Sequence, residues 1–116
     1  RALTMRKLAD AGVGAEEFLS PGYVFPLIAN PAGVLGRQGQ TEGSFDLARL
    51  SGFSPSGVIC EILNKDGTMA RGESLFAFAK EHNLRVTSVE EIIKFLIRQE
   101  VSVRAVTRAS LETDYG

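Results

Sequence analysis

The chain has 116 residues, of which 44% are hydrophobic and 23% are charged, and its formal net charge is -1. That composition supports one domain with one core. The basic residues do not cluster, which excludes a nucleic-acid binder of the basic type. No apolar run approaches the roughly 20 residues that a bilayer span requires, and no signal-peptide core is present near the first residue.

Cysteine usage indicates the compartment. Cys60 is the one cysteine of the chain, so it cannot form an internal disulfide. It lies in an apolar segment, and we therefore expect a buried thiol in a reduced, cytoplasmic protein. His82 is the one histidine, and no cluster of histidine, cysteine or aspartate has the spacing of a metal site.

The first third of the chain predicts one helix, a further helical turn and two extended pieces. Apolar residues recur at helical spacing over residues 1–11, and residues 15–19 add a turn. Residues 23–29 are apolar and predict a strand, which Pro26 restricts to a sheet edge or a bulge. Residues 34–35 are expected to be extended.

The pattern of residues 41–50 predicts an amphipathic helix. Phe45 and Ala48 are expected on its buried face, whereas Asp46 and Arg49 are expected to face solvent.

The second half alternates predicted strands and helices. Residues 58–63 read as a central strand buried on both faces, and a tight turn at 64–67 leads into a hairpin. Residues 73–81 are amphipathic and helical, and residues 84–87 form a short strand. A capping box at residues 88–91 opens a last helix.

Alternating helices and strands predict an α/β (or α+β-like) domain with a mixed β-sheet covered by helices. From residue 99 the character changes. Residues 101–104 alternate like a strand, and residues 107–116 are polar, so we interpret residues 99–116 as a linker or the start of another module.

A candidate phosphate site lies in the loop before the helix at 41–50. Arg37 offers paired N–H donors, Gly39 lets the backbone approach a ligand, and Thr41 places a hydroxyl at a helix N-terminus. An ordinary turn with an N-capping threonine explains the same residues without a ligand.

Two further residues are candidates for acid–base chemistry. Glu61 interrupts an apolar run and could act as a general acid or base. Alternatively, its side chain could reach solvent or pair with Arg37 or Arg71. Tyr23 follows a Pro-Gly turn and could donate a hydrogen bond to a sugar oxygen, or it could be an aromatic residue at a strand edge.

Several motifs occur together in an order that resembles one known family. The chain resembles the C-terminal half of 3,4-dihydroxy-2-butanone 4-phosphate synthase over residues 1–98. The matching segments are residues 21–27, 33–35, 39–42, 46–48, 57–62 and 66–71. Residues 101–116 resemble the junction that leads into a GTP cyclohydrolase II domain in bifunctional members.

The resemblance implies an activity in riboflavin biosynthesis. The family converts D-ribulose 5-phosphate into L-3,4-dihydroxy-2-butanone 4-phosphate and formate, with Mg²⁺ (or Mn²⁺) as cofactor, in a homodimer whose active sites lie near the subunit interface. Residues that match the family's substrate-phosphate segment are Arg37, Gln38, Gly39, Gln40 and Thr41, and Glu61 matches its essential glutamate.

The chain departs from the family pattern at two positions. Gln40 stands where the family has a metal-binding histidine, and Tyr23 stands where it has a catalytic histidine. A glutamine offers a neutral amide oxygen to a metal but cannot take a proton. Tyrosine, with a reference pKa of about 10, is a poor proton shuttle at neutral pH.

The family's acidic loop, which supplies another metal carboxylate, would precede Arg1. We therefore expect the 116-residue chain to be inactive alone. Two other interpretations remain open. The chain could belong to a catalytically degenerate member that serves dimerisation or scaffolding, or it could be a module that binds a sugar phosphate without reaction.

Overall fold

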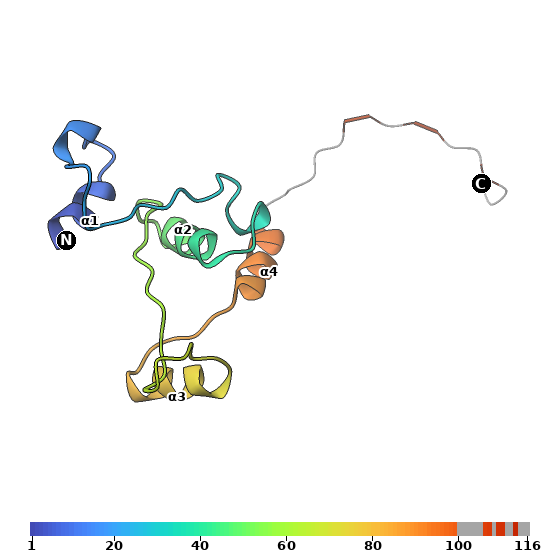
Figure 1. Cartoon of the computed structure of the whole chain (residues 1–116). Helices are drawn as coiled ribbons and strands as arrows, with labels where there is room; N and C mark the ends of the chain where they lie inside the picture. Colours follow the sequence, from blue (N-terminus) through green and yellow to red (C-terminus); the bar gives the residue numbers. More distant parts are fainter. Residues whose placement is uncertain (100–105, 108, 111–112, 114–116) are drawn as a thin grey trace.

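Helices are the regular elements of the computed structural model, which describes residues 1–99, 106–107, 109–110 and 113 (Figure 1). In chain order they are α1 (Ala2–Leu8), the 3-10 helices η1 (Ala15–Glu17) and η2 (Gly33–Leu35), α2 (Gln40–Leu50), α3 (Glu73–Glu81) and α4 (Val89–Gln99). Within this described part the only β-pairing is a single antiparallel bridge between Leu63 and Met69.

The predicted helices are confirmed, with small shifts at their ends. The helix expected at 73–81 has those bounds, and α4 begins where the capping box places it. The Ser88 Oγ accepts the N–H of Glu91 at 3.2 Å, as a capping serine should. The helix expected from Thr41 begins at Gln40 instead, with Gly39 as its N-cap.

The predicted mixed sheet is wrong, because the segments expected to form strands are not paired. Residues 23–29, 58–62 and 84–87 have no strand assignment, and residues 34–35, expected to be extended, belong to η2. An apolar run can favour a strand, but a strand forms only where a neighbour takes up its N–H and C=O groups. In the described part, residues 58–62 meet such a neighbour only at Ile62, whose carbonyl accepts the N–H of Ala70.

The turn at residues 64–67 does form the predicted hairpin. The N–H of Asn64 donates to the carbonyl of Thr68 at 2.8 Å, and the N–H of Gly67 donates to the carbonyl of Asn64 at 3.0 Å. Asp66 accepts the N–H of Thr68 at 3.0 Å and its hydroxyl at 2.6 Å. Local side-chain contacts are therefore enough for this turn, although no longer strand pair follows from it.

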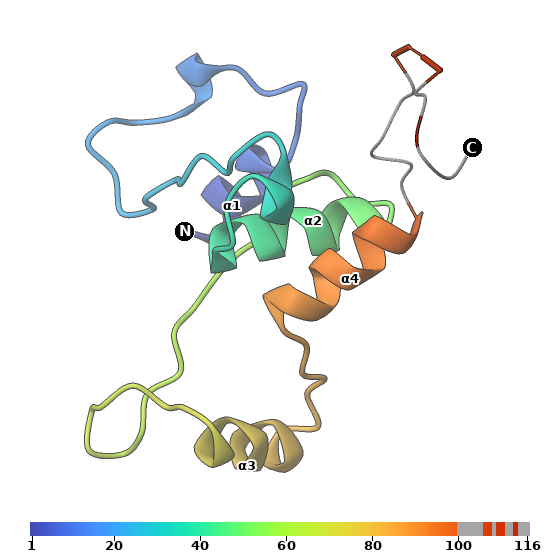
Figure 2. The same ribbon diagram turned by 90° about the vertical axis from the view of Figure 1, so that its right-hand side faces the viewer.

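The core is small and lies where η2, α2 and α4 meet; we call these three elements the central unit. Val34, Ile92 and Leu96 form its apolar cluster, and Val89 and Ile93 pack against them. Helices α2 and α4 lie side by side in Figures 1 and 2 and are in contact with each other and with η2. No other pair of helices in the described ranges makes contact.

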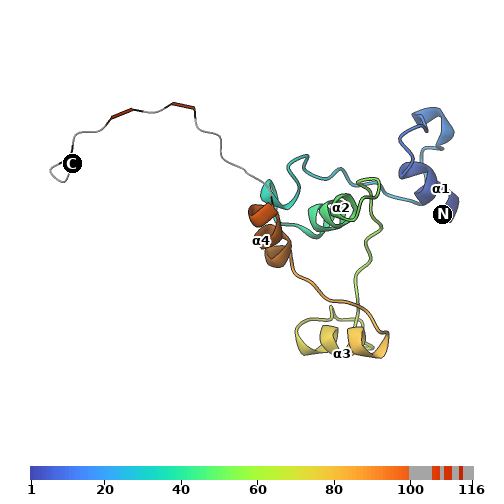
Figure 3. The ribbon, with the colours of Figure 1, turned by 180° about the vertical axis from the view of Figure 1, so that it is seen from behind.

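Outside the central unit much apolar surface is exposed. Helix α3 and the hairpin lie apart from α2 and α4 and are joined to them by extended connections, as the view from behind also shows (Figure 3). We call residues 23–29 and 53–63 the open segments. Most of their large hydrophobic side chains are exposed, with 84% of Phe25, 98% of Ile28 and 71% of Val58 accessible to solvent.

Three expectations about burial are corrected by this arrangement. The strand expected to be buried on both faces is largely exposed, and Cys60, expected to be a buried thiol, is exposed. Asp46, expected to face solvent, is buried, with 1% of its surface accessible. The alternating residues 101–104 lie outside the described residues, as does most of the interpreted linker at 99–116.

Candidate functional site

The predicted phosphate segment lies at the N-terminus of α2. Helix α2 has 11 residues, its N-cap is Gly39, and no side chain caps it. The first N–H groups of a helix lack intrahelical acceptors and carry a partial positive charge. Gln40 and Thr41 are the first two residues of the helix, so the segment 37–41 sets a guanidinium, backbone N–H groups and a hydroxyl at one place.

Two buried carboxylates of α2 fasten the loop that precedes it. Glu42 Oε1 accepts the N–H of Asn30 at 3.1 Å, and Asp46 Oδ2 accepts the N–H of Val34 at 2.7 Å. The two acids are one helical turn apart and therefore share a face. Both are 1% exposed, and each holds a backbone donor that would otherwise be left unpaired on a short loop.

Glu42 also binds the arginine of the predicted site. Arg37 Nη1 donates to Glu42 Oε2 at 3.0 Å, and the arginine side chain is 66% exposed whereas that of the glutamate is 2% exposed. The Asn30 N–H, and with it the Arg37 guanidinium, holds the pKa of the Glu42 carboxyl below its usual range. The carboxylate is therefore charged at neutral pH. In this ion pair Glu42 is buried and Arg37 is accessible to solvent.

Asp46 has a second partner as well. Arg49 donates from Nε at 3.3 Å and from Nη2 at 3.2 Å to Asp46 Oδ1. Gly33, with a φ of +58°, lies directly under this carboxylate, because a Cβ at position 33 would collide with the Asp46 side chain. The close approach of η2 to α2 therefore requires a glycine there.

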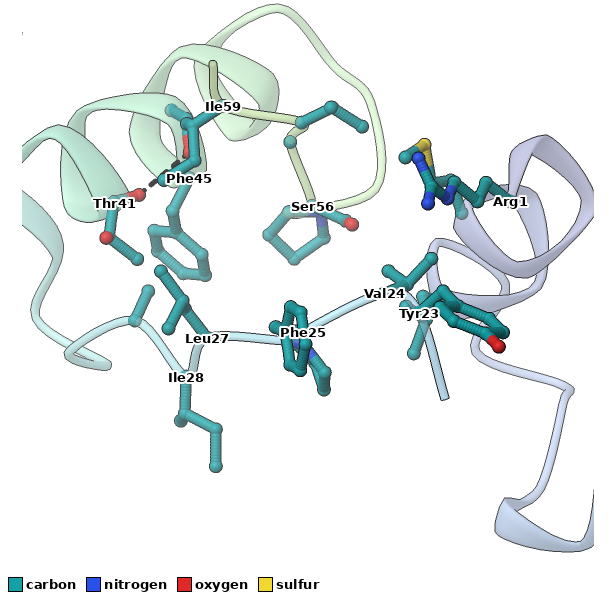
Figure 4. Close-up of a pocket in the computed structure, with 18 residues that line it drawn as sticks. Arg1, Tyr23, Val24, Phe25, Leu27, Ile28, Thr41, Phe45, Ser56 and Ile59 are labelled. Carbon is teal, nitrogen blue, oxygen red and sulfur yellow. Dashed lines mark hydrogen bonds between the residues drawn. The ribbon is translucent and has the colours of Figure 1, made fainter. Parts of the chain in front are cut away.

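An apolar cavity of about 610 Å³ lies beside α2 and contains two of the predicted site residues. Tyr23 and Thr41 are among its lining residues, together with residues 24–29 and 55–59 of the open segments. Figure 4 shows Phe25 and Leu27 of one open segment opposite Phe45 of α2. Tyr23 is 84% exposed, and the Arg1 guanidinium lies 5.9 Å from its ring centre.

Glu61 is not joined to the phosphate segment within the described residues. It is exposed, and the cavity lining extends along the same open segment to Ile59 but does not include it. None of the hydrogen bonds or ion pairs found in the described part connects it to Arg37 or Thr41. The structure thus brings residues 37–41 together, places Tyr23 and Thr41 on one cavity, and leaves Glu61 outside that set.

Sequence reasoning missed the contacts by which Glu42 and Asp46 hold the loop that precedes α2 at Asn30 and Val34. A signal was present, since positions 42 and 46 are spaced four apart and a glycine-containing turn precedes the helix. A charged residue on a helix is ordinarily assigned to the solvent face, and only the contact with the loop reverses that assignment.

Comparisons with known proteins identify the family. A sequence model of 3,4-dihydroxy-2-butanone 4-phosphate synthase matches residues 1–95. The chain belongs to the 3,4-dihydroxy-2-butanone 4-phosphate synthase family. Similar curated proteins include the riboflavin biosynthesis protein RibBA of Aquifex aeolicus, 49% identical over 116 residues, and that of Staphylococcus aureus, 42% identical. Both matches cover the whole chain, but only 29% and 30% of those proteins.

Solved structures of this synthase family resemble the chain in conformation. One is RibBX of A. baumannii, a two-domain 3,4-dihydroxy-2-butanone 4-phosphate synthase, with a TM-score of 0.89 and 40% identity. It matches 100% of this chain, which spans 34% of that one. The synthase of Candida albicans has a TM-score of 0.80 and 35% identity over 83% of this chain and 50% of its own.

Proposed function

We propose that this chain is part of a lyase of riboflavin biosynthesis that converts D-ribulose 5-phosphate into L-3,4-dihydroxy-2-butanone 4-phosphate and formate. The observation that carries the proposal is membership of the synthase family, which holds for residues 1–95. The chain spans about a third or less of the curated relatives named above, so the activity is assigned to the longer protein and not to these 116 residues.

Residues 37–41 would bind the substrate phosphate in this scheme. A guanidinium matches a phosphate with paired N–H donors, and the N-terminus of α2 adds backbone N–H groups and a positive partial charge. Arg37, Gln38, Gly39, Gln40 and Thr41 are the residues proposed for this role. The arginine is accessible to a ligand, since 66% of its side chain is exposed.

Glu61 would move protons in the reaction. Enolisation next to a carbonyl needs a base, and an acid must then return the proton during the skeletal shift that releases one carbon as formate. An exposed carboxylate can serve as that group once the substrate is bound. Tyr23, on the cavity that also contains Thr41, would contribute a hydrogen bond and not a readily exchanged proton.

The family's metal requirement is not met by the described residues alone. Among them, no group of three or more histidine, cysteine, aspartate or glutamate side chains is placed to hold a metal ion. Gln40 is exposed at the start of α2 and offers one amide oxygen. Mg²⁺ or Mn²⁺ would therefore need ligands from elsewhere in the longer protein, and we derive no step of the reaction through the metal.

We assign residues 1–98 to the synthase domain and residues 99–116 to a linker toward a further domain. The open segments support the view that the rest of a longer protein covers this chain, because large apolar side chains such as Ile28 and Phe25 rarely stay so exposed together. A homodimer and a cytoplasmic location are part of the same proposal. In the described part no helix has the length and apolarity needed to cross a membrane.

A catalytically degenerate member is the second candidate, and Tyr23 and Gln40 favour it. Both stand where the resemblance implies histidines, and neither side chain exchanges a proton readily at neutral pH. Such a protein would keep the fold for dimerisation or scaffolding. The third candidate is a module that binds ribulose 5-phosphate without reaction.

These alternatives are tested by incubating the intact protein with D-ribulose 5-phosphate and Mg²⁺ and measuring the formate that is released. Turnover is expected, and Glu61→Gln should lower kcat by about 100-fold or more, as is usual for loss of an acid–base group. Glu81→Gln, a change of an exposed carboxylate at the end of α3, is the matched control and should leave kcat unchanged. If the unmodified protein shows no turnover, and turnover appears only when Tyr23→His and Gln40→His are introduced, the protein is the degenerate member instead.

A further inference from the structure

Glu42 is a buried acid beside a proposed phosphate site, where its negative charge works against phosphate binding. Its two carboxylate oxygens each accept a hydrogen bond, one from the Asn30 N–H and the other from Arg37 Nη1. A buried carboxylate with both oxygens bound is fixed in position. The Glu42 carboxylate is therefore a fixed partner for Arg37. It cannot itself attract the phosphate, because both groups are negatively charged.

Arg37 still has N–H groups available for a ligand while its guanidinium is bound to Glu42. Its contact with Glu42 uses Nη1, and within the described part of the chain no acceptor is bound to Nη2 or Nε. A guanidinium has five N–H donors in one plane. Fixing one edge of that plane on the glutamate leaves another edge open to solvent, where two parallel N–H groups suit a phosphate.

Gly39 confirms how closely the ion pair lies against the start of α2. A Cβ at position 39 would come within 2.6 Å of Glu42 Oε2 and 2.9 Å of Arg37 Nη1. The glycine has an ordinary extended backbone, with φ -120° and ψ 162°, so it is not required for its conformation. A side chain at this position would have to displace the ends of Arg37 and Glu42, because the pair occupies that space.

We propose that Glu42 is a positioning residue that holds Arg37 over the N-terminus of α2, with its free N–H groups toward the substrate phosphate. The inference rests on the proposed function, in which Arg37 binds that phosphate. Ordering a long side chain on binding weakens affinity by up to about tenfold, so an arginine that is already ordered binds more tightly.

A simpler role for Glu42 is to fasten the loop at Asn30, as Asp46 fastens it at Val34. The two roles differ in one respect. A fastening role acts whether or not an arginine is present, whereas a positioning role needs Arg37.

Binding of inorganic phosphate to the intact protein, measured by calorimetry, separates the two roles. Glu42→Gln is expected to weaken binding by about tenfold, and the same change in an Arg37→Ala background should weaken it no further. Asp46→Asn is the matched control. It removes a buried carboxylate from the same helix face without contacting Arg37, so it should lower the melting temperature and leave phosphate affinity unchanged.

Gly39→Ala provides a second route if Glu42→Gln does not fold. The added methyl group would crowd the Arg37–Glu42 contact and shift the exposed arginine without removing a charge, and the extended backbone at position 39 accepts alanine. The expected result is the same loss of about tenfold, absent again in the Arg37→Ala background.

Two failures of this experiment have different meanings. If Arg37→Ala binds phosphate as well as the unmodified protein, the phosphate site in the proposed function is wrong. If Arg37→Ala weakens binding but Glu42→Gln and Gly39→Ala do not, or weaken it equally with and without the arginine, the positioning role is overturned and the proposed function stands.

Discussion

The open segments are richer in apolar residues than the central unit, yet their side chains are much less buried. In the central unit, Val34 is fully buried and Leu96 is 1% exposed, whereas in the open segments Phe25 is 84% exposed. The central unit has local partners, because a helix satisfies its own backbone and needs only one apolar stripe covered. The open segments need a neighbour for both backbone and side chains.

Polar contacts add to this difference. Asp46 and Glu42 join η2 and its preceding loop to α2 through backbone N–H groups, and their burial would be unfavourable without those partners. The open segments have no comparable anchor. The part of the chain that carries the predicted phosphate segment is therefore the part stabilised by its own contacts.

Leu96→Ala should show the largest effect on stability. The side chain is 1% exposed and packs in the apolar cluster with Val34 and Ile92. Its truncation is expected to lower the free energy of unfolding by about 2–5 kcal/mol, measured by urea denaturation of the chain.

Phe25→Ala is the matched change in an open segment. In the 116-residue chain it should alter the free energy of unfolding by no more than about 0.5 kcal/mol, as exposed positions do. A cost equal to that of Leu96→Ala in the same chain would remove the distinction between the two regions. A large cost that is seen only in the intact protein would show that another part of that protein covers the segment.

Gly33→Ala should be next in size. It combines a φ of +58°, unfavourable for alanine, with a collision against the Asp46 side chain. We therefore expect the free energy of unfolding to fall by about 2–3 kcal/mol. The measurement is thermal or urea unfolding.

Gly52→Ala provides its control, because φ is +77° there and no atom lies within 4 Å of the added methyl group. The free energy of unfolding of that variant should fall only by the cost of the unfavourable backbone conformation, about 1 kcal/mol. Equal losses in the two variants would mean that the approach of η2 to the Asp46 carboxylate does not matter.

The pH dependence of stability should reveal Glu42. Its folded-state pKa is lowered from the ordinary 4.5, chiefly by the Asn30 N–H. The charged form is therefore favoured by folding, and the stabilisation is complete above pH 4.5 and lost as the pH falls through the lower folded-state pKa.

Glu42→Gln should reduce the acid sensitivity of the central unit, because it removes one carboxyl whose pKa is lowered by folding. Urea midpoints at neutral pH and well below pH 4.5 should differ less in the variant than in the unmodified chain. An unchanged pH profile would show that the carboxylate is not the group responsible.

Lys94→Ala should have the smallest effect. Lys94 pairs with Glu90 at 2.8 Å and with Glu91 at 3.2 Å, and all three side chains are about half exposed or more. Surface ion pairs of this kind stabilise little and are screened by salt. The expected change in melting temperature is small and should vanish in high salt, whereas a large, salt-resistant change would place these residues against another surface.

Sequence reasoning succeeded for the helices and failed for the strands, and the reason is visible at particular residues. Ser88 and the apolar spacing of residues 92–96 define α4 locally, and both are confirmed. Residues 58–63 have an equally strong apolar pattern. A strand, however, forms only beside a second strand, and the pattern of one segment does not show whether such a neighbour is present. Of the candidate site, the segment 37–41 stays a prediction from local chemistry, whereas the contacts of Glu42 with Asn30 and Arg37 were not predicted.

The sequence by itself determined the family, the helices and the hairpin turn, because each of these is encoded by neighbouring residues or by motifs in a fixed order. The phosphate-binding role of residues 37–41 stays a prediction. Only the tertiary structure decided that Asp46 and Glu42 are buried and that Glu61 and Cys60 are exposed. Burial depends on which distant segment lies against a side chain, and spacing along one chain does not contain that information.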